Sequence, residues 1–150
     1  MVGRCWRPGL VAVAVFSATL AGCTSYTGSP AHQVQEWAAG AGVVVNDAQL
    51  ASDVTLLRKS VAARAPSAMT TNCAGLSYDS GTAYDNLPTP DSAITNELNI
   101  AYTDFLDAGN ACAAASSVTS ARVRAALVEI ASGLDHLERA GALLKRDGVS

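Results

Sequence analysis

Apolar residues recur every three or four positions along most of the chain, a spacing that places them on one face of an α-helix. The most regular stretch lies in the second half of the sequence and consists of Ile94, Leu98, Ala101, Phe105, Ala108 and Cys112. The last stretch has the same period and consists of Val123, Leu127, Ile130, Leu134, Leu137, Gly141 and Leu144. Both stretches are predicted to be amphipathic helices that bury one stripe of side chains.

The first half of the chain shows the same period with more interruptions. A first helix is predicted on the short stripe of Val34, Trp37 and Ala38. Gly40 and Gly42 then break the pattern, because glycine is a poor helix former. A second helix is predicted from Asn46 to Arg64, on the stripe of Leu50, Val54, Leu57 and Val61. The pattern leaves open whether residues 30–64 form two helices or one helix with a glycine kink.

A third helix is predicted after Pro66, with a polar residue in its stripe. The stripe consists of Met69, Cys73, Leu76 and Ala83, and it keeps the helical period if Ser80 occupies a core position. The starts of two of these helices are predicted where a hydroxyl residue precedes a proline. Ser29-Pro30 begins the first helix, and Thr89-Pro90 begins the helix that contains Ile94. A hydroxyl caps the first turn of a helix, and proline fits within that turn.

Amphipathic stripes joined by short connections are buried most simply in an antiparallel helical bundle. The predicted fold class is therefore all-α, with a bundle of about four helices over residues 30–150. This length suffices for a single small domain.

The first 22 residues have the order of a secretory signal peptide. Arg4 and Arg7 precede an apolar stretch of about 14 residues, which is shorter than the roughly 20 that a membrane-spanning helix needs. The stretch ends in Leu20-Ala21-Gly22-Cys23, which matches the lipobox of bacterial lipoproteins. This resemblance implies cleavage before Cys23 and attachment of fatty acyl chains such as palmitate to that cysteine. An ordinary secretory signal followed by a fortuitous cysteine is the alternative.

Residues 23–29 are small and polar, and they are predicted to be the lipidated cysteine and a flexible tether. Two or more acyl chains hold a protein stably on a bilayer. The predicted location is therefore the extracytoplasmic face of the cell membrane, with the lipid on Cys23 as the anchor.

Four cysteines are present, of which Cys5 would leave with the signal peptide and Cys23 would carry the lipid. Cys73 and Cys112 remain, and an even pair in an exported, oxidising setting predicts one disulfide. A two-thiolate metal site is the alternative. His32 and His136 have no ligand spacing to either cysteine, so no metal site is predicted.

The order of Cys73-x-x-Leu76, the Leu-Pro-Thr-Pro-Asp segment at 87–91, a helix ending in Cys112 and a closing amphipathic helix carries a second resemblance. It is similar to small alanine-rich exported proteins and lipoproteins of high-GC Gram-positive bacteria. The resemblance implies a helical bundle with one disulfide at the outer face of the cytoplasmic membrane. It supplies no catalytic residues, and so implies no activity.

Charge is distributed unevenly along the chain. Loss of Arg4 and Arg7 would leave eight basic residues against thirteen acidic ones, a net charge near minus five. No lysine or arginine lies between Arg64 and Arg122, although this segment contains Asp79, Asp85, Asp91, Glu97, Asp104 and Asp107. A solvated acidic face is the main interpretation, with a calcium site or an acidic docking surface as the alternatives. The negative charge disfavours nucleic-acid binding.

The sequence contains no G-x-S-x-G, S-x-x-K, H-E-x-x-H, C-x-x-C or P-loop motif. No catalytic residue and no cofactor are predicted from it. His32 is expected to be solvated, and His136 is expected to face water beside the stripe of Leu134 and Leu137.

These observations predict an envelope lipoprotein that is not an enzyme and that binds a partner protein or supports a membrane complex. The alternative is a module that binds a small apolar ligand or a lipid. Many small residues lie on the helical stripes, where tight packing and a cavity are both possible.

Overall fold

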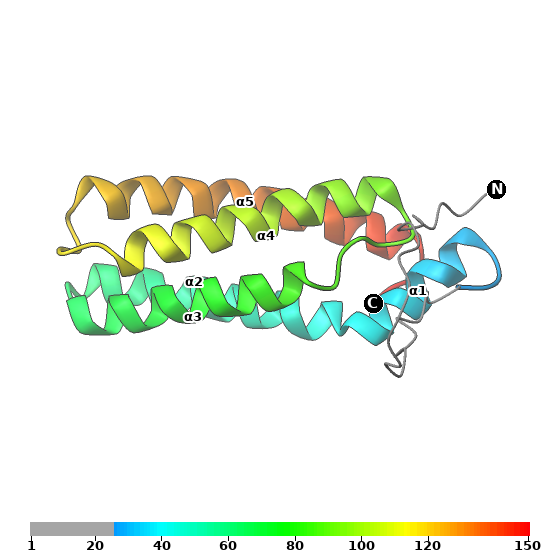
Figure 1. Cartoon of the computed structure of the whole chain (residues 1–150), viewed down its shortest axis with the longest axis horizontal. Helices are drawn as coiled ribbons and strands as arrows, with labels where there is room; N and C mark the ends of the chain where they lie inside the picture. Colours follow the sequence, from blue (N-terminus) through cyan, green and yellow to red (C-terminus); the bar gives the residue numbers. More distant parts are fainter. Residues whose placement is uncertain (1–25) are drawn as a thin grey trace, which may run out of the picture.

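The computed structural model describes residues 26–150. Over that range the chain forms five helices and no strand: α1 (Pro30–Ala41), α2 (Val43–Ala62), α3 (Pro66–Tyr84), α4 (Ser92–Ala113) and α5 (Ala121–Arg146). The four long helices, α2 to α5, run antiparallel to their neighbours in the chain (Figure 1). The predicted all-α antiparallel bundle is therefore confirmed. None of the described helices is long and apolar enough to cross a membrane.

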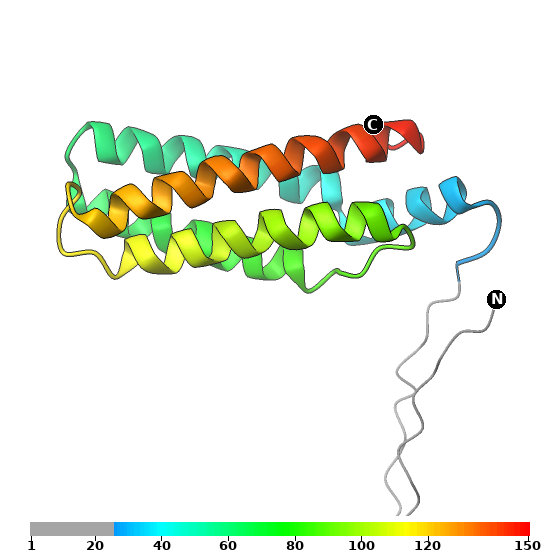
Figure 2. The ribbon, with the colours of Figure 1, turned by 90° about the horizontal axis from the view of Figure 1, so that it is seen from above.

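The short helix α1 lies at one end of the bundle, which we call the α1 end (Figure 2). The connection between α3 and α4 and the chain end after α5 lie at this same end, whereas the α2–α3 and α4–α5 connections lie at the opposite end (Figure 1). The most extensive helix contacts are between α4 and its two neighbours, α3 and α5, followed by those between α2 and α3.

The stripes predicted for α1, α3 and α4 form the core. All six stripe residues of α4 are buried, as are the three of α1. In α3 the buried residues are Met69, Cys73, Leu76, Ser80 and Ala83, so the predicted core position of Ser80 is confirmed. The Ser80 hydroxyl donates to the carbonyl of Leu76 at 2.5 Å, which satisfies this polar group inside an apolar core.

Residues 30–62 form two helices separated by Gly42. This glycine has a left-handed backbone, with φ of 61°, which favours glycine because it has no Cβ atom. The second helix begins at Val43 and ends at Ala62, whereas the sequence predicted Asn46 to Arg64. Arg64 has a φ of 52°, outside the helical region, so the predicted end was two residues too late.

The predicted disulfide joins Cys73 of α3 to Cys112 of α4, and their Cα atoms lie 5.8 Å apart. Gly109, one turn before Cys112, makes this close approach possible. A Cβ atom on Gly109 would lie 2.8 Å from the Cys73 carbonyl oxygen and 2.7 Å from the Ser77 nitrogen. In the chain-entropy model, closing this loop stabilises the fold by about 4 kcal/mol.

The stripe predicted for α5 is rotated in the structure. Val123, Ile130 and Leu144 are buried as predicted, but Leu127, Leu134 and Leu137 are only partly buried. The small residues Ala126, Gly133 and Ala140 face the core instead. Gly133 lies against Phe105, since a Cβ atom there would lie 2.7 Å from the Phe105 ring. Close packing on α4 therefore selects the small residues of α5 for the interface.

The start of α4 also differs from the prediction. Asp91, rather than Thr89, is the N-cap, and its carboxylate accepts from the backbone nitrogens of Ala93 and Ile94. The Thr89 hydroxyl donates instead to the Asp91 carbonyl at 2.6 Å. Asp91 is favoured over Thr89 as the N-cap because an ionised oxygen makes a stronger hydrogen bond to the backbone N–H groups at a helix N-terminus.

Candidate functional site

The predicted lipidation residue, Cys23, lies outside the described residues. The structure describes the chain from Tyr26 onward, three positions later. Tyr26 is partly buried against the core, beside Trp37, Ala41 and Asn86. Whatever Cys23 carries is therefore linked by a very short segment to the α1 end of the bundle.

Two long-range hydrogen bonds fasten α1 to the rest of the bundle. The indole nitrogen of Trp37 donates to the carbonyl of Asn86, in the α3–α4 connection, at 3.0 Å. The side-chain nitrogen of Gln35 donates to the carbonyl of Asp147, just after α5, at 2.6 Å. These contacts position α1 between the α3–α4 connection and the residues that follow α5.

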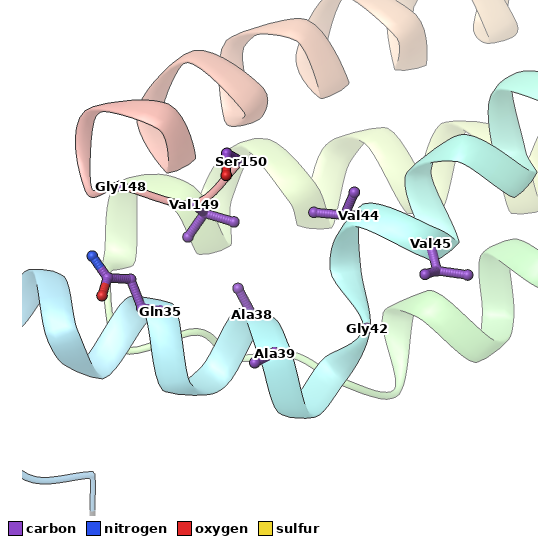
Figure 3. Close-up of a pocket in the computed structure, with 9 residues that line it drawn as sticks. All are labelled: Gln35, Ala38, Ala39, Gly42, Val44, Val45, Gly148, Val149 and Ser150. Carbon is purple, nitrogen blue, oxygen red and sulfur yellow. The ribbon is translucent and has the colours of Figure 1, made fainter.

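Two adjoining hollows open at the α1 end. One, of about 410 Å³, lies between α1, the start of α2 and residues 148–150 (Figure 3). The other, of about 180 Å³, lies between the first turns of α2 and the last turns of α5, and is lined by Val43, Val44, Asp47, Gly141, Leu144, Lys145, Val149 and Ser150. Val44, Val149 and Ser150 line both hollows. We call the smaller one the α2–α5 hollow.

Asp47 is the acidic residue of the α2–α5 hollow. It lies one turn into α2 and is half-buried, and its Oδ1 accepts from the Tyr102 hydroxyl of α4 at 3.1 Å. Burial raises the pKa of Asp47 to about 6, an effect that the Tyr102 hydrogen bond opposes. Burial, together with the nearby Asp47 charge, also raises the pKa of the Tyr102 hydroxyl. At neutral pH the site therefore combines a carboxylate with a neutral phenol.

A buried carboxyl group, that of Asp53, lies further along α2. Asp53 accepts from the Gln49 side chain at 3.1 Å, while its Oδ2 atom is buried without a hydrogen-bond partner in the described residues. Burial, and next the neighbouring Asp79 of α3, raise the pKa of Asp53 to about 6. No group of three or more His, Cys, Asp or Glu side chains in the described part of the chain is arranged to hold a metal ion.

His136 does not face water, so the prediction for this residue was wrong. Its Nδ1 lies 2.7 Å from Oε2 of Glu97 on α4, and only 20% of its side chain is exposed. Arg139, one turn later on α5, donates to the same Glu97 oxygen at 2.9 Å. Arg139 first, and His136 second, lower the pKa of Glu97. The rotation of α5 described above turns His136 toward α4.

A histidine held by a carboxylate is also the orienting half of a general-base arrangement. In such a site the second imidazole nitrogen faces a nucleophile. Among the described residues, the side-chain hydrogen bonds and ion pairs of His136 involve Glu97 alone. The geometry therefore defines a polar clamp between α4 and α5.

The acidic residues between 79 and 107 do not form one uniform solvated face. Glu97 pairs with α5, and Asp91 both caps α4 and pairs with Arg146 at 3.2 Å. Asp104 has a buried Oδ2 atom without a described partner, whereas Asp85 and Asp107 are exposed. The basic partners of Asp91 and Glu97, Arg146 and Arg139, both come from α5.

The sequence contains a signal for the partial burial of Asp47. Counting back from Leu50 and Val54 at helical spacing leads to Asp47 and then to Val43, and Val43 is buried. A charged residue at such a position is unusual unless a polar group meets it. The partner, Tyr102, could not be identified from spacing, because it comes from a helix more than fifty residues away.

Comparison with known proteins does not assign the chain to a class. No protein-family model, curated protein or solved structure matches it.

Proposed function

We propose that the protein is an envelope lipoprotein, anchored through a lipid on Cys23, whose helical bundle binds a partner protein without catalysing a reaction. The observation that carries the proposal is the Leu20-Ala21-Gly22-Cys23 sequence at the end of a signal-like apolar stretch. The small residues suit a peptidase that cuts before Cys23, and the thiol is the group that accepts the lipid.

The distance between Cys23 and the bundle supports a defined orientation at the membrane. Three peptide units separate Cys23 from Tyr26, so their Cα atoms lie within about 11 Å of each other. Tyr26 packs at the α1 end. A lipid on Cys23 would therefore hold this end next to the bilayer, with α2 to α5 available to a partner.

The anchor is tested by metabolic labelling with a clickable palmitate analogue. The wild-type chain is expected to take up the label, while the Cys23→Ala variant is expected to remain unlabelled and uncleaved at this site. Cys5→Ala is the matched control, because Cys5 lies within the predicted signal peptide and should leave labelling unchanged. Label in Cys23→Ala at the wild-type level would exclude the lipoprotein assignment.

A further inference from the structure

The α2–α5 hollow combines apolar walls with a charged group. Val43, Val44, Leu144 and Val149 contribute aliphatic side chains, and Asp47 contributes a carboxyl group. Gly141 leaves space on the α5 side, since a Cβ atom on this residue would meet no other atom within 4 Å. The hollow is thus an apolar site with one polar group of defined position, which is the usual composition of a small-molecule site.

Asp47 has hydrogen-bonding capacity left over. The side-chain hydrogen bonds described for it use only Oδ1, which accepts from Tyr102. Oδ2 is not among the fully buried side-chain atoms that lack a partner, and Asp47 is one of the residues that line the hollow. Lys145 also lines the hollow, but it is exposed, and the ion pairs found among the described residues do not join it to Asp47.

The hydrogen bond to Tyr102 does not by itself require a charged residue at position 47. The Tyr102 hydroxyl requires an acceptor, and an asparagine side chain would accept the same hydrogen bond. A carboxylate costs more to bury than a neutral amide unless a cation or a further donor meets it. The free oxygen beside aliphatic walls is therefore complementary to a molecule with an apolar body and a positively charged donor.

We propose that the α2–α5 hollow binds a small aliphatic amine, with its ammonium group on Asp47 and its hydrocarbon part against Val43, Val44 and Leu144. The ammonium group donates to Oδ2 while Tyr102 holds Oδ1, so the carboxylate is fully hydrogen-bonded in the complex. The site does not depend on the lipid at Cys23, and it goes beyond the partner-binding role proposed above.

The proposal is tested by photolabelling the full chain in isolated membranes. The probe is an octylamine analogue with a diazirine in its chain and a terminal alkyne, and labelled peptides are identified by mass spectrometry. Label is expected in the first two turns of α2 and the last turns of α5. An octanoic acid analogue of the same design is expected to label these peptides about tenfold less, because its carboxylate would face Asp47.

Two variants separate the charge from the shape of the hollow. Asp47→Asn keeps an acceptor for Tyr102 but removes the charge, and it is expected to reduce labelling about tenfold. Gly141→Leu fills the space next to α5 and is expected to reduce labelling while Asp47 stays intact. Asp53→Asn is the matched control, because it makes the same change at a buried acid of α2 that does not line the hollow, and it should leave labelling unchanged.

Resistance to trypsin, compared with the wild-type chain, verifies that each variant is folded. Equal labelling by the amine and acid probes would overturn the proposal. So would labelling that persists at the wild-type level in folded Asp47→Asn or Gly141→Leu. Labelling in the unlipidated Cys23→Ala variant distinguishes this site from the anchor, since the amine site is expected to survive loss of the lipid.

Discussion

At the scale of single residues, the contact between His136 and Glu97 joins two helices. His136 lies on α5 beyond the fully buried Ile130, and its imidazole contacts the Glu97 carboxylate of α4. Arg139 shares the same acceptor oxygen. A shared carboxylate links two side chains of α5 to one of α4, and partial burial makes the His136–Glu97 hydrogen bond stronger than an equivalent contact in water.

Three alanine variants of α5 are expected to rank by burial and contact. Ile130→Ala should lower the free energy of unfolding by about 2 to 5 kcal/mol, as expected for a fully buried aliphatic residue. Val128→Ala, at a position that is 70% exposed, should change it by less than about 0.5 kcal/mol. His136→Ala should fall between them, because it leaves Glu97 with one partner fewer. Urea titration with the disulfide intact measures all three, and a His136→Ala effect as small as that of Val128→Ala would contradict the clamp.

Residue spacing predicted much of the core, but not the partners of polar residues. The positions of Ser80 and the two disulfide cysteines followed from helical period and cysteine count. The contacts of His136 and Asp47 depend on the rotation of one helix about its axis relative to another, which a single helix does not encode. Leu127 and Leu134 are more apolar than Ala126 and Gly133, so hydrophobicity alone favoured the wrong phase for α5.

At the scale of elements, two glycines determine where the helices approach each other most closely. Gly109 of α4 lies against the backbone of α3, and Gly133 of α5 lies against Phe105 of α4. These two interfaces are the most extensive in the bundle. From the sequence, small residues on the stripes are compatible with either tight packing or a cavity. At Gly109 and Gly133 the structure shows tight packing.

The packing role of Gly109 is tested by comparing it with Gly75 of α3. Gly109→Ala should destabilise the protein by about 1 to 3 kcal/mol, because its Cβ atom would clash with fixed backbone atoms of Cys73 and Ser77. Gly75→Ala should stabilise it by roughly 0.5 to 1 kcal/mol, since alanine is the better helix former and no neighbouring atom lies within 4 Å of its Cβ position. Thermal unfolding compares the two variants. A stabilising Gly109→Ala would show that α3 and α4 are not in contact there.

At the scale of the whole molecule, the acidic groups divide into two classes with opposite effects on stability. Glu97, paired with Arg139 and His136, has a lowered pKa, so its contribution is lost only when the pH falls through that lowered value. Asp47 and Asp53 have pKa values raised to about 6 by burial. Their charged forms are disfavoured in the folded protein, and both lie on α2, whose most extensive contacts are with α3.

Stability is therefore expected to rise as the pH is lowered from 7 to 5. Between their ordinary pKa of 3.8 and the folded value of about 6, Asp47 and Asp53 bind protons in the folded state but not in the unfolded state. The free energy of unfolding consequently falls as the pH rises from 5 to 7, by about 1 kcal/mol for each carboxyl group. Urea titrations at pH 5 and pH 7 measure the difference.

The double variant Asp47→Asn, Asp53→Asn isolates these two groups from every other titrating residue. It keeps both hydrogen-bond acceptors but cannot ionise, so it should be more stable than the wild-type chain at pH 7 and should lose most of its stability difference between the two pH values. An unchanged pH dependence in the double variant would show that burial raises the pKa of neither carboxyl group. In that case the Asp47 carboxylate would carry no burial cost for an ammonium group to offset, so this measurement also tests the electrostatic argument for the proposed site.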